Sequence, residues 1–196
     1  MIKPGIKDDR KKWDELKKSV ASLKGGNNVD IGVFGASGSD IVKIAGIHEF
    51  GGIINHPGGT TYGYSSKEDA IAGKVSFMKT GGGFMSLGVT KPHAIKIPER
   101  SYLRSSFDEE KPKMVKAIDK AKIDVVTGKV NKEKFLDRLG FGFSRKVVEK
   151  INKSKTWAVK NADSTIKKKS TSSGVGDQPL VDTGRLRQSI TYRISK

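Results

Sequence analysis

The sequence predicts an α+β fold in which a small antiparallel sheet packs against two or three long helices. Long stretches with apolar residues at helical spacing alternate with short stretches in which every second residue is apolar. A glycine-rich stretch, 53–92, interrupts this pattern. We therefore expect a single domain over 1–196, with an inserted β-hairpin loop at 53–92 and an extended C-terminal arm at 153–178.

The N-terminal quarter predicts two helices and one strand. Residues 8–24 have an amphipathic pattern with lysines on the outer face. The apolar positions of this helix are Trp13, Leu16, Val20 and Leu23. Residues 29–35 alternate and predict a strand, and Asp40 is suited to begin a second helix that ends near Phe50. The residues expected on the inner side of the second helix are Ile41, Ile44, Ala45 and His48.

The insertion differs from its surroundings in composition. Ten of the 42 residues from 51 to 92 are glycine. We expect two strands, 74–78 and 84–89, joined by a turn at 80–83. Insertions of this length usually lie on the surface and often carry function, so the hairpin is expected to reach toward partners.

The next segment predicts a strand followed by a long helix. Residues 93–97 alternate, and Pro98 is expected to end that strand. The helix is expected over 101–125, with either a kink at Pro112 or a restart capped by Asp108.

The C-terminal part predicts a third long helix and a last strand. Asn131 is suited to cap the helix, which runs to about 153. Its apolar stripe is Leu136, Leu139, Phe143, Val147 and Ile151. Gly140 and Gly142 either weaken this helix, by about 1 kcal/mol each relative to alanine, or permit close packing. The expected sheet consists of the strands 29–35, 93–97 and 189–195.

Charge and composition exclude several classes of protein. Lysine and arginine number 38 against 21 aspartate and glutamate residues, and the resulting charge of +17 predicts attraction to an acidic partner. The absence of cysteine excludes disulfides, thiolate metal sites and cysteine nucleophiles. No apolar run has the roughly 18–20 residues of a membrane span, and no secretory signal is visible. We expect synthesis in the cytoplasm and no membrane partner.

No metal, cofactor or phosphate site is indicated. The three histidines, His48, His56 and His93, lack the spacing of a His-Glu-x-x-His zinc site. The glycine run at 80–83 lacks the lysine and the following helix of a phosphate-binding loop.

The string from Leu180 to Gly184 (Leu-Val-Asp-Thr-Gly) is similar to the catalytic turn of aspartic proteases. The chain has one copy, so a dimer would have to supply the second aspartate, and Arg185 stands where those enzymes have Ser or Ala. We expect instead a tight turn capped by Asp182 or Thr183, with Leu186 packed inward. The sequence therefore predicts no enzyme.

Three strings, taken in order, resemble one known family. They are 44–52 (IAGIHEFGG), 97–104 (IPERSYLR) and 179–190 (PLVDTGRLRQSI). Their order and spacing resemble the virion-morphogenesis family of tailed bacteriophages, which includes Mu-like tail-completion and head–tail joining proteins. The motif residues are His48, Glu49, Phe50, Gly51, Pro98, Arg100, Asp182, Thr183, Gly184 and Arg185. The insertion and the N-terminal helix have no counterpart in this resemblance.

The resemblance implies a structural virion protein that completes the tail and joins it to the head. It implies a homo-oligomeric ring, expected to be a hexamer, at the head–tail junction. The neighbours would be connector or head-closure, tail-terminator and tail-tube proteins, with packaged DNA as a second, nonspecific contact. We expect Glu49 and Arg100 to pair, because both motifs bracket the same loop. The expected assembly contacts are Lys74, Phe77, Phe84, Trp157, Lys167, Lys168 and Lys169.

The charge also fits an alternative, a basic DNA-associated protein without enzymatic activity. The basic residues are spread over every helix, however, and no aromatic stacking platform or zinc-finger spacing is visible. Lysine-rich outer faces of helices are usually only solvated. The virion protein is therefore the preferred prediction, and the DNA-associated protein stays open beside it.

Overall fold

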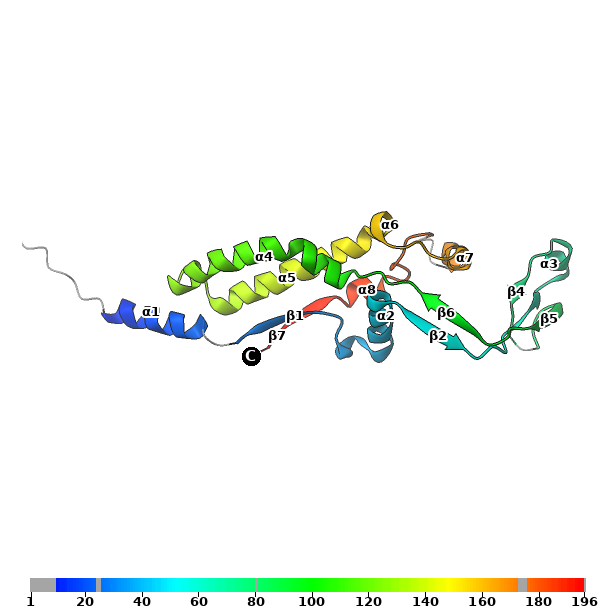
Figure 1. The fold of residues 1–196 in the computed structure, drawn as a ribbon, viewed down its shortest axis with the longest axis horizontal. Helices are drawn as coiled ribbons and strands as arrows, with labels where there is room; N and C mark the ends of the chain where they lie inside the picture. The colour runs from blue at the N-terminus through cyan, green and yellow to red at the C-terminus, as the bar shows by residue number, and fades with distance from the viewer. Residues whose placement is uncertain (1–9, 24–25, 80, 173–175, 196) are drawn as a thin grey trace, which may run out of the picture. The chain divides into compact units, whose positions relative to one another are not determined.

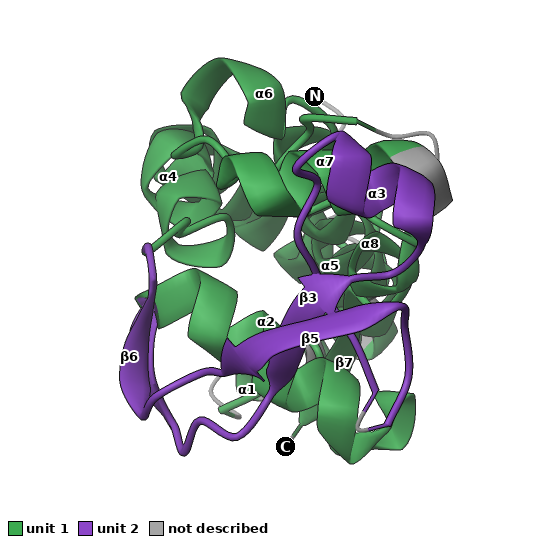
Figure 2. Cartoon of the chain, turned by 90° about the vertical axis from the view of Figure 1, so that its right-hand side faces the viewer, with its two compact units in different colours: residues 1–50, 99–196 green, residues 51–98 purple. Residues whose placement is uncertain are grey.

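The computed structural model describes residues 10–23, 26–79, 81–172 and 176–195. Its helices and small antiparallel sheets make an α+β fold, as the sequence predicts. The chain forms two compact units (Figure 2): unit 1 consists of 1–50 and 99–196, and unit 2 of 51–98. Unit 2 contains the expected insertion, 53–92, together with the residues that flank it.

Unit 1 holds most of the helices and one two-stranded sheet (Figure 1). Its elements, in order, are α1 (Arg10–Leu23), β1 (Asn28–Gly32), the 3-10 turn η1 (Gly35–Ser37), α2 (Ser39–Phe50), α4 (Leu103–Val126), α5 (Lys132–Asn152), α6 (Ser154–Trp157), α7 (Asp163–Ser172), α8 (Arg185–Gln188) and β7 (Thr191–Ser195).

The sheet of unit 1 pairs the beginning of the chain with its end. β1 and β7 are antiparallel, with Val29 opposite Ile194 and Ile31 opposite Tyr192, and both strands contact α5. The strand 93–97 forms as expected, but the prediction that it joins this sheet is wrong. It forms β6 (His93–Ile97) and pairs with β2 (Gly52–His56) in unit 2. β2 and β6 are the first and last strands of unit 2, where the chain enters and leaves it.

The long helices α4 and α5 lie side by side (Figure 1). The Asn131 side chain accepts hydrogen bonds from the backbone N–H groups of Glu133 and Lys134, which confirms the expected cap of α5. The restart expected near Pro112 is wrong, since one helix runs through it. Pro112 removes one N–H donor and crowds the preceding turn, but the helix is buried on both sides of it, at Ser106 and at Ala121.

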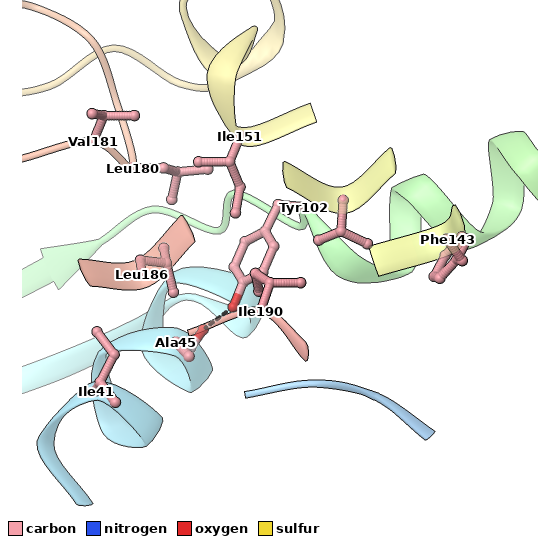
Figure 3. Packing of buried hydrophobic residues seen from close by; sticks show 10 residues of the cluster. Ile41, Ala45, Tyr102, Phe143, Ile151, Leu180, Val181, Leu186 and Ile190 are labelled. Atoms are coloured by element: carbon pink, nitrogen blue, oxygen red, sulfur yellow. Dashed lines mark hydrogen bonds between the residues drawn. The ribbon is translucent and has the colours of Figure 1, made fainter. Parts of the chain in front are cut away.

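The core of unit 1 joins α2, α5 and the segment that leads to β7 (Figure 3). Its buried members are Ile41, Ala45, Tyr102, Phe143, Val147, Ile151, Leu180, Val181, Leu186 and Ile190. Three residues of the expected α5 stripe, at 143, 147 and 151, are among them, and the stripe is confirmed there.

The extended arm expected at 153–178 is wrong in its described part, because α6 and α7 form there. Two hydrogen bonds tie these helices to the chain that follows. The buried Ser154 hydroxyl donates to the carbonyl of Pro179 at 2.6 Å, and the Lys169 ammonium donates to the carbonyl of Gln178 at 2.6 Å. The polar composition of 153–178 suggests a loose segment, because composition does not show the tertiary hydrogen bonds that hold α6 and α7.

Unit 2 contains two small sheets and one short helix. Besides β2 and β6 it has β3 (Thr61–Tyr64), α3 (Lys67–Ile71), β4 (Ser76–Phe77) and β5 (Met85–Val89). The expected hairpin between 74–78 and 84–89 is wrong, because β3 lies between β4 and β5 and pairs with both. The expected turn at 80–83 lies partly outside the described residues. β3 escaped notice because it is short and carries Gly63, where a Cβ would lie 2.1 Å from the carbonyl oxygen of Met85.

Close packing at one of the two glycines of α5 gives a first test. A Cβ built on Gly140 would lie 2.3 Å from Cδ2 of Tyr192, whose hydroxyl donates to Asp137 on the same helix at 2.5 Å. At Gly142 a Cβ would meet nothing within 4 Å.

We expect Gly140→Ala to lower the free energy of unfolding by about 1–3 kcal/mol, because the tyrosine ring must shift. The matched control Gly142→Ala is expected to raise it by up to about 1 kcal/mol through helix propensity. Urea denaturation measures both. Equal effects of the two substitutions would contradict the proposed contact.

Candidate functional site

The last turn of α2 brings a carboxylate to the start of α4. Ile41, Ala45 and Glu49 are spaced by four residues, so they share one side of the helix, and all three are buried. The prediction that Ile44 lies on the inner side is wrong, because this side chain is exposed. The inward stripe of α2 thus ends in an acidic residue.

The Glu49 carboxylate accepts four hydrogen bonds from the string 97–104. One oxygen, Oε1, accepts from the Ser101 hydroxyl at 2.7 Å, from the Arg104 backbone N–H at 3.0 Å and from Arg104 Nε at 3.1 Å. The other, Oε2, accepts from the Leu103 backbone N–H at 2.9 Å. Only 4% of Glu49 is exposed. The buried charge is therefore matched by donors on both oxygens.

Glu49 acts as the cap of α4 from another part of the chain. The first N–H groups of a helix have no partner within it, and a negative charge there also interacts favourably with the helix dipole. The residue before α4 is Tyr102, whose hydroxyl instead donates to the carbonyl of Ala45 at 3.4 Å (Figure 3). Burial raises the pKa of Tyr102, so the phenol stays neutral and keeps its proton to donate.

Arg104 completes the arrangement around the carboxylate. Its Nη2 donates to the backbone carbonyl of Glu49 at 2.9 Å and to Glu99 Oε1 at 2.7 Å. The guanidinium also lies over the ring of Phe50, 4.7 Å from its centroid. The hydrogen bond with Glu49 and the charge of Glu99 raise the pKa of Arg104. One side chain thus binds the end of α2 at three places.

The expected pair between Glu49 and Arg100 is wrong. Arg100 is buried, and it donates to backbone carbonyls: Nε to Val159 at 2.7 Å and Nη2 to Lys160 at 3.1 Å. Nη2 also donates to the side-chain oxygen of Asn161 at 3.3 Å. Arg100 therefore connects this string to the segment between α6 and α7.

Backbone geometry explains why Arg104 binds Glu49 in place of Arg100. The backbone N–H of Arg100 donates to the carbonyl of His48 at 2.7 Å, so Arg100 itself is held against the end of α2 before α4 begins. Arg104 lies one turn farther along, on the side of α4 that faces Glu49. The sequence places both arginines in one string and cannot show which of them faces the carboxylate.

The third string, 179–190, packs against the same core. Leu180, Val181, Leu186 and Ile190 are buried beside Ala45 and Tyr102 (Figure 3). Gly184 precedes α8 with φ of 81°, a value that favours glycine, and the expected inward packing of Leu186 is confirmed. Asp182, Thr183 and Arg185 are exposed at the turn. The three strings of the resemblance therefore meet in unit 1.

Two basic side chains, Arg100 and Lys169, lie near the buried His48. Nδ1 of His48 is buried and has no hydrogen-bond partner among the described residues. Burial, and then the charges of Arg100 and Lys169, lower the pKa of His48. Burial likewise lowers the pKa of Arg100 and Lys169. A neutral His48 is the form that suits this environment.

The structure divides the expected assembly residues into two groups. Phe77 and Phe84 in unit 2 are 73% and 56% exposed, and Lys74 is exposed with an ion pair to Asp69 at 3.6 Å. Lys167 and Lys168 on α7 are also exposed.

The other two expected assembly residues are engaged inside unit 1. The indole of Trp157 packs against the core and donates to the carbonyl of Lys150 at 2.9 Å. Lys169 is buried. Neither residue therefore presents the open surface that Phe77 and Phe84 present, and as assembly contacts both stay predictions. The remaining motif residues, Gly51 and Pro98, stand at the junctions where the chain enters and leaves unit 2; Gly51 has φ of 70°.

The polar groups of this arrangement bind one another. Both carboxylate oxygens of Glu49, and Nε and Nη2 of Arg100, are hydrogen-bonded to other groups of the chain itself. Among the described residues, no group of three or more His, Asp or Glu side chains could hold a metal ion. The described helices also include none with both the length and the apolar character that crossing a membrane requires.

Comparisons with known proteins add no relative. No protein-family model matches the chain, and neither a curated protein nor a solved structure matches it.

Sequence reasoning missed Arg104 and Ser101 as partners of Glu49. Both lie within a string that the sequence singles out, at the expected start of a helix. A signal was present, since the first turn of any helix needs acceptors, and a buried carboxylate 50 residues earlier can supply them. Only the tertiary contact between α2 and α4 identifies that carboxylate.

The cap of α4 gives a second test. We expect Glu49→Gln to lower the free energy of unfolding by about 2–4 kcal/mol, because the amide keeps one acceptor oxygen and turns an NH₂ group toward buried donors. The matched control Glu99→Gln removes the other partner of Arg104, but that pair is exposed, so little change is expected. Chemical denaturation of both variants decides, and similar losses would refute the assignment.

The buried His48 gives a third test. Its folded-state pKa lies below the ordinary value of 6.5, so the unfolded chain takes up a proton at higher pH than the folded one. This contribution to stability is present above the unfolded pKa and is lost as the pH falls below 6.5 toward the folded pKa. We expect His48→Gln to show a smaller loss of stability over this range than the natural chain. Thermal melts at neutral and mildly acidic pH measure it, and parallel pH curves would exclude this role.

Proposed function

We propose that the chain is a structural virion protein of a tailed bacteriophage, a tail-completion or neck subunit that joins the tail to the head. One observation carries the proposal. The three strings that resemble this family, 44–52, 97–104 and 179–190, lie far apart in the sequence, and their side chains meet in one core and one hydrogen-bonded cap. Chance matches would have no physical reason to lie together.

A structural role is supported by how the motif residues are used. Glu49, Arg100 and Arg104 hold backbone segments together and leave their charges paired or hydrogen-bonded within the chain. A catalytic carboxylate or arginine has to keep at least part of its bonding capacity for a substrate. We therefore propose a protein without enzymatic activity.

Unit 2 supports a role in contacts with partners. Many of its large apolar side chains are exposed; they are Ile53, Ile54, Ile71, Val75, Phe77, Phe84, Met85, Leu87, Val89 and Ile95. Exposed apolar surface on this scale is typical of protein interaction sites. We propose that the apolar surface of unit 2 binds neighbouring virion proteins: connector or head-closure, tail-terminator or tail-tube proteins. The ring, expected to be a hexamer, would lie at the head–tail junction, with packaged DNA as a nonspecific contact.

Electron microscopy gives the fourth test. In a phage that encodes this chain, a nonsense mutation in its gene is expected to yield separate heads and tails. Complementation with the natural chain should restore joined particles. Complementation with Phe77→Ser/Phe84→Ser should not, because the variant lacks two exposed rings of unit 2. The matched control Lys67→Ser changes an exposed polar side chain of the same unit and should restore joining.

The outcomes separate the proposal from its alternative. Normal particles without the protein would refute a joining role. Normal particles with altered DNA handling, together with binding to random duplex DNA that weakens steeply with salt, would support the basic DNA-associated protein instead.

A further inference from the structure

Helix α1 exposes apolar side chains along one side. Trp13, Leu16 and Val20 follow at spacings of three and four, so they share a side. Trp13 is 58% exposed and Val20 is 41% exposed, while Leu16 is half-buried. A helix of 14 residues is marginal in water unless its apolar side is covered. α1 touches α4 of its own chain, but that contact leaves Trp13 and Val20 open to solvent.

An apolar cleft of matching size opens elsewhere in unit 1. It has a volume of about 840 Å³ and lies between β1, α4 and α5. Phe107, Met114 and Ile118 line it from α4, and Leu136 and Leu139 from α5. These side chains are half-buried or exposed and have further apolar surface to lose to a partner.

Length and charge fit α1 to this cleft. The lining of α4 from 103 to 118 extends about 22 Å, and α1 is about 21 Å long at 1.5 Å per residue. Asp30 and Asp108 line the cleft together with one basic residue, Arg104. Asp30 pairs with Arg193 at 3.0 Å, and Arg104 is bound by Glu49 and Glu99, so the charge of Asp108 remains for a partner.

Helix α1 carries lysines beside its apolar side as well as opposite it, and the Lys17 ammonium lies over the Trp13 ring, 5.5 Å from its centroid. Lys11, Lys17 and Lys18 lie on the helix and are exposed. The helix also carries Asp14 and Glu15, and Asp14 pairs with Lys17 at 3.6 Å. The remaining positive charge is complementary to Asp108 of the cleft, which favours encounter.

We propose that α1 of one copy binds in the cleft of a second copy, so that successive copies join head to tail. Helix and cleft are two different surfaces of the same unit, and a ring is closed by repeating such a heterologous contact. The choice of a second copy rests on the proposed ring. Within its own chain α1 contacts α4 and still leaves Trp13 and Val20 exposed, so their apolar surface is available to a second copy.

Cysteine cross-linking tests the contact directly, because the natural chain has no cysteine. One full-length chain carries Val20→Cys on α1, and a second, with a mass tag, carries Met114→Cys in the cleft. A short bismaleimide should join tagged to untagged chains in the mixture. The matched control Lys116→Cys lies on α4 outside the cleft and should give little product.

A second measurement removes the apolar side of α1. Trp13→Ser/Val20→Ser changes exposed residues outside the core, so the fold should persist, as circular dichroism can verify. Light scattering across a dilution series should show self-association at least about tenfold weaker than for the natural chain.

Each outcome bears on the contact itself. The proposal is overturned if the natural chain stays monomeric, if the variant associates equally well or if Lys116→Cys cross-links as efficiently as Met114→Cys. It is also overturned if a chain with both Val20→Cys and Met114→Cys cross-links only within itself. Unjoined heads and tails without α1–cleft cross-links would leave the proposed function standing. Cross-links between purified chains, together with normal assembly of a phage that lacks the protein, would leave the contact standing and refute the proposed function.

Discussion

Unit 1 depends on the capping of α4 by the Glu49 carboxylate. It is buried, and it accepts hydrogen bonds from Ser101 and from the first backbone N–H groups of α4. The chain leaves unit 1 after Phe50 and returns at Glu99, so this cap closes the insertion at its base. A lost cap would leave both a buried charge and unpaired helix donors, and either alone destabilises a protein.

The high positive charge of the chain has two physical roles. Part of it is built into unit 1, where Arg100 and Lys169 are buried and donate to backbone carbonyls of Val159 and Gln178. Those hydrogen bonds organise the region of α6 and α7. Burial, and after it the same two charges, lower the pKa of His48. The rest lies on exposed helix faces such as α1, where it can steer encounters with acidic surfaces.

Local patterns predicted the elements whose signals are local. The cap at Asn131, the stripe through Phe143 and Val147, and the strands that became β1 and β7 depend on residues a few positions apart, and they are confirmed. The strand β3 was not predicted because it has only four residues, one of them Gly63, and because its pairing partners, β4 and β5, follow it in the sequence. For the site, sequence alone identified the three strings and Glu49 but assigned Arg100 as its partner.

The sequence by itself determined the α+β class, most helix positions and the strings that form the site, since periodicity and capping act over one or two turns. Only the tertiary structure decided which strands pair, that 51–98 forms a unit of its own and that Arg104 rather than Arg100 binds Glu49. Contacts between distant segments depend on which donors and acceptors packing brings within about 3 Å, and no spacing along the chain encodes that distance.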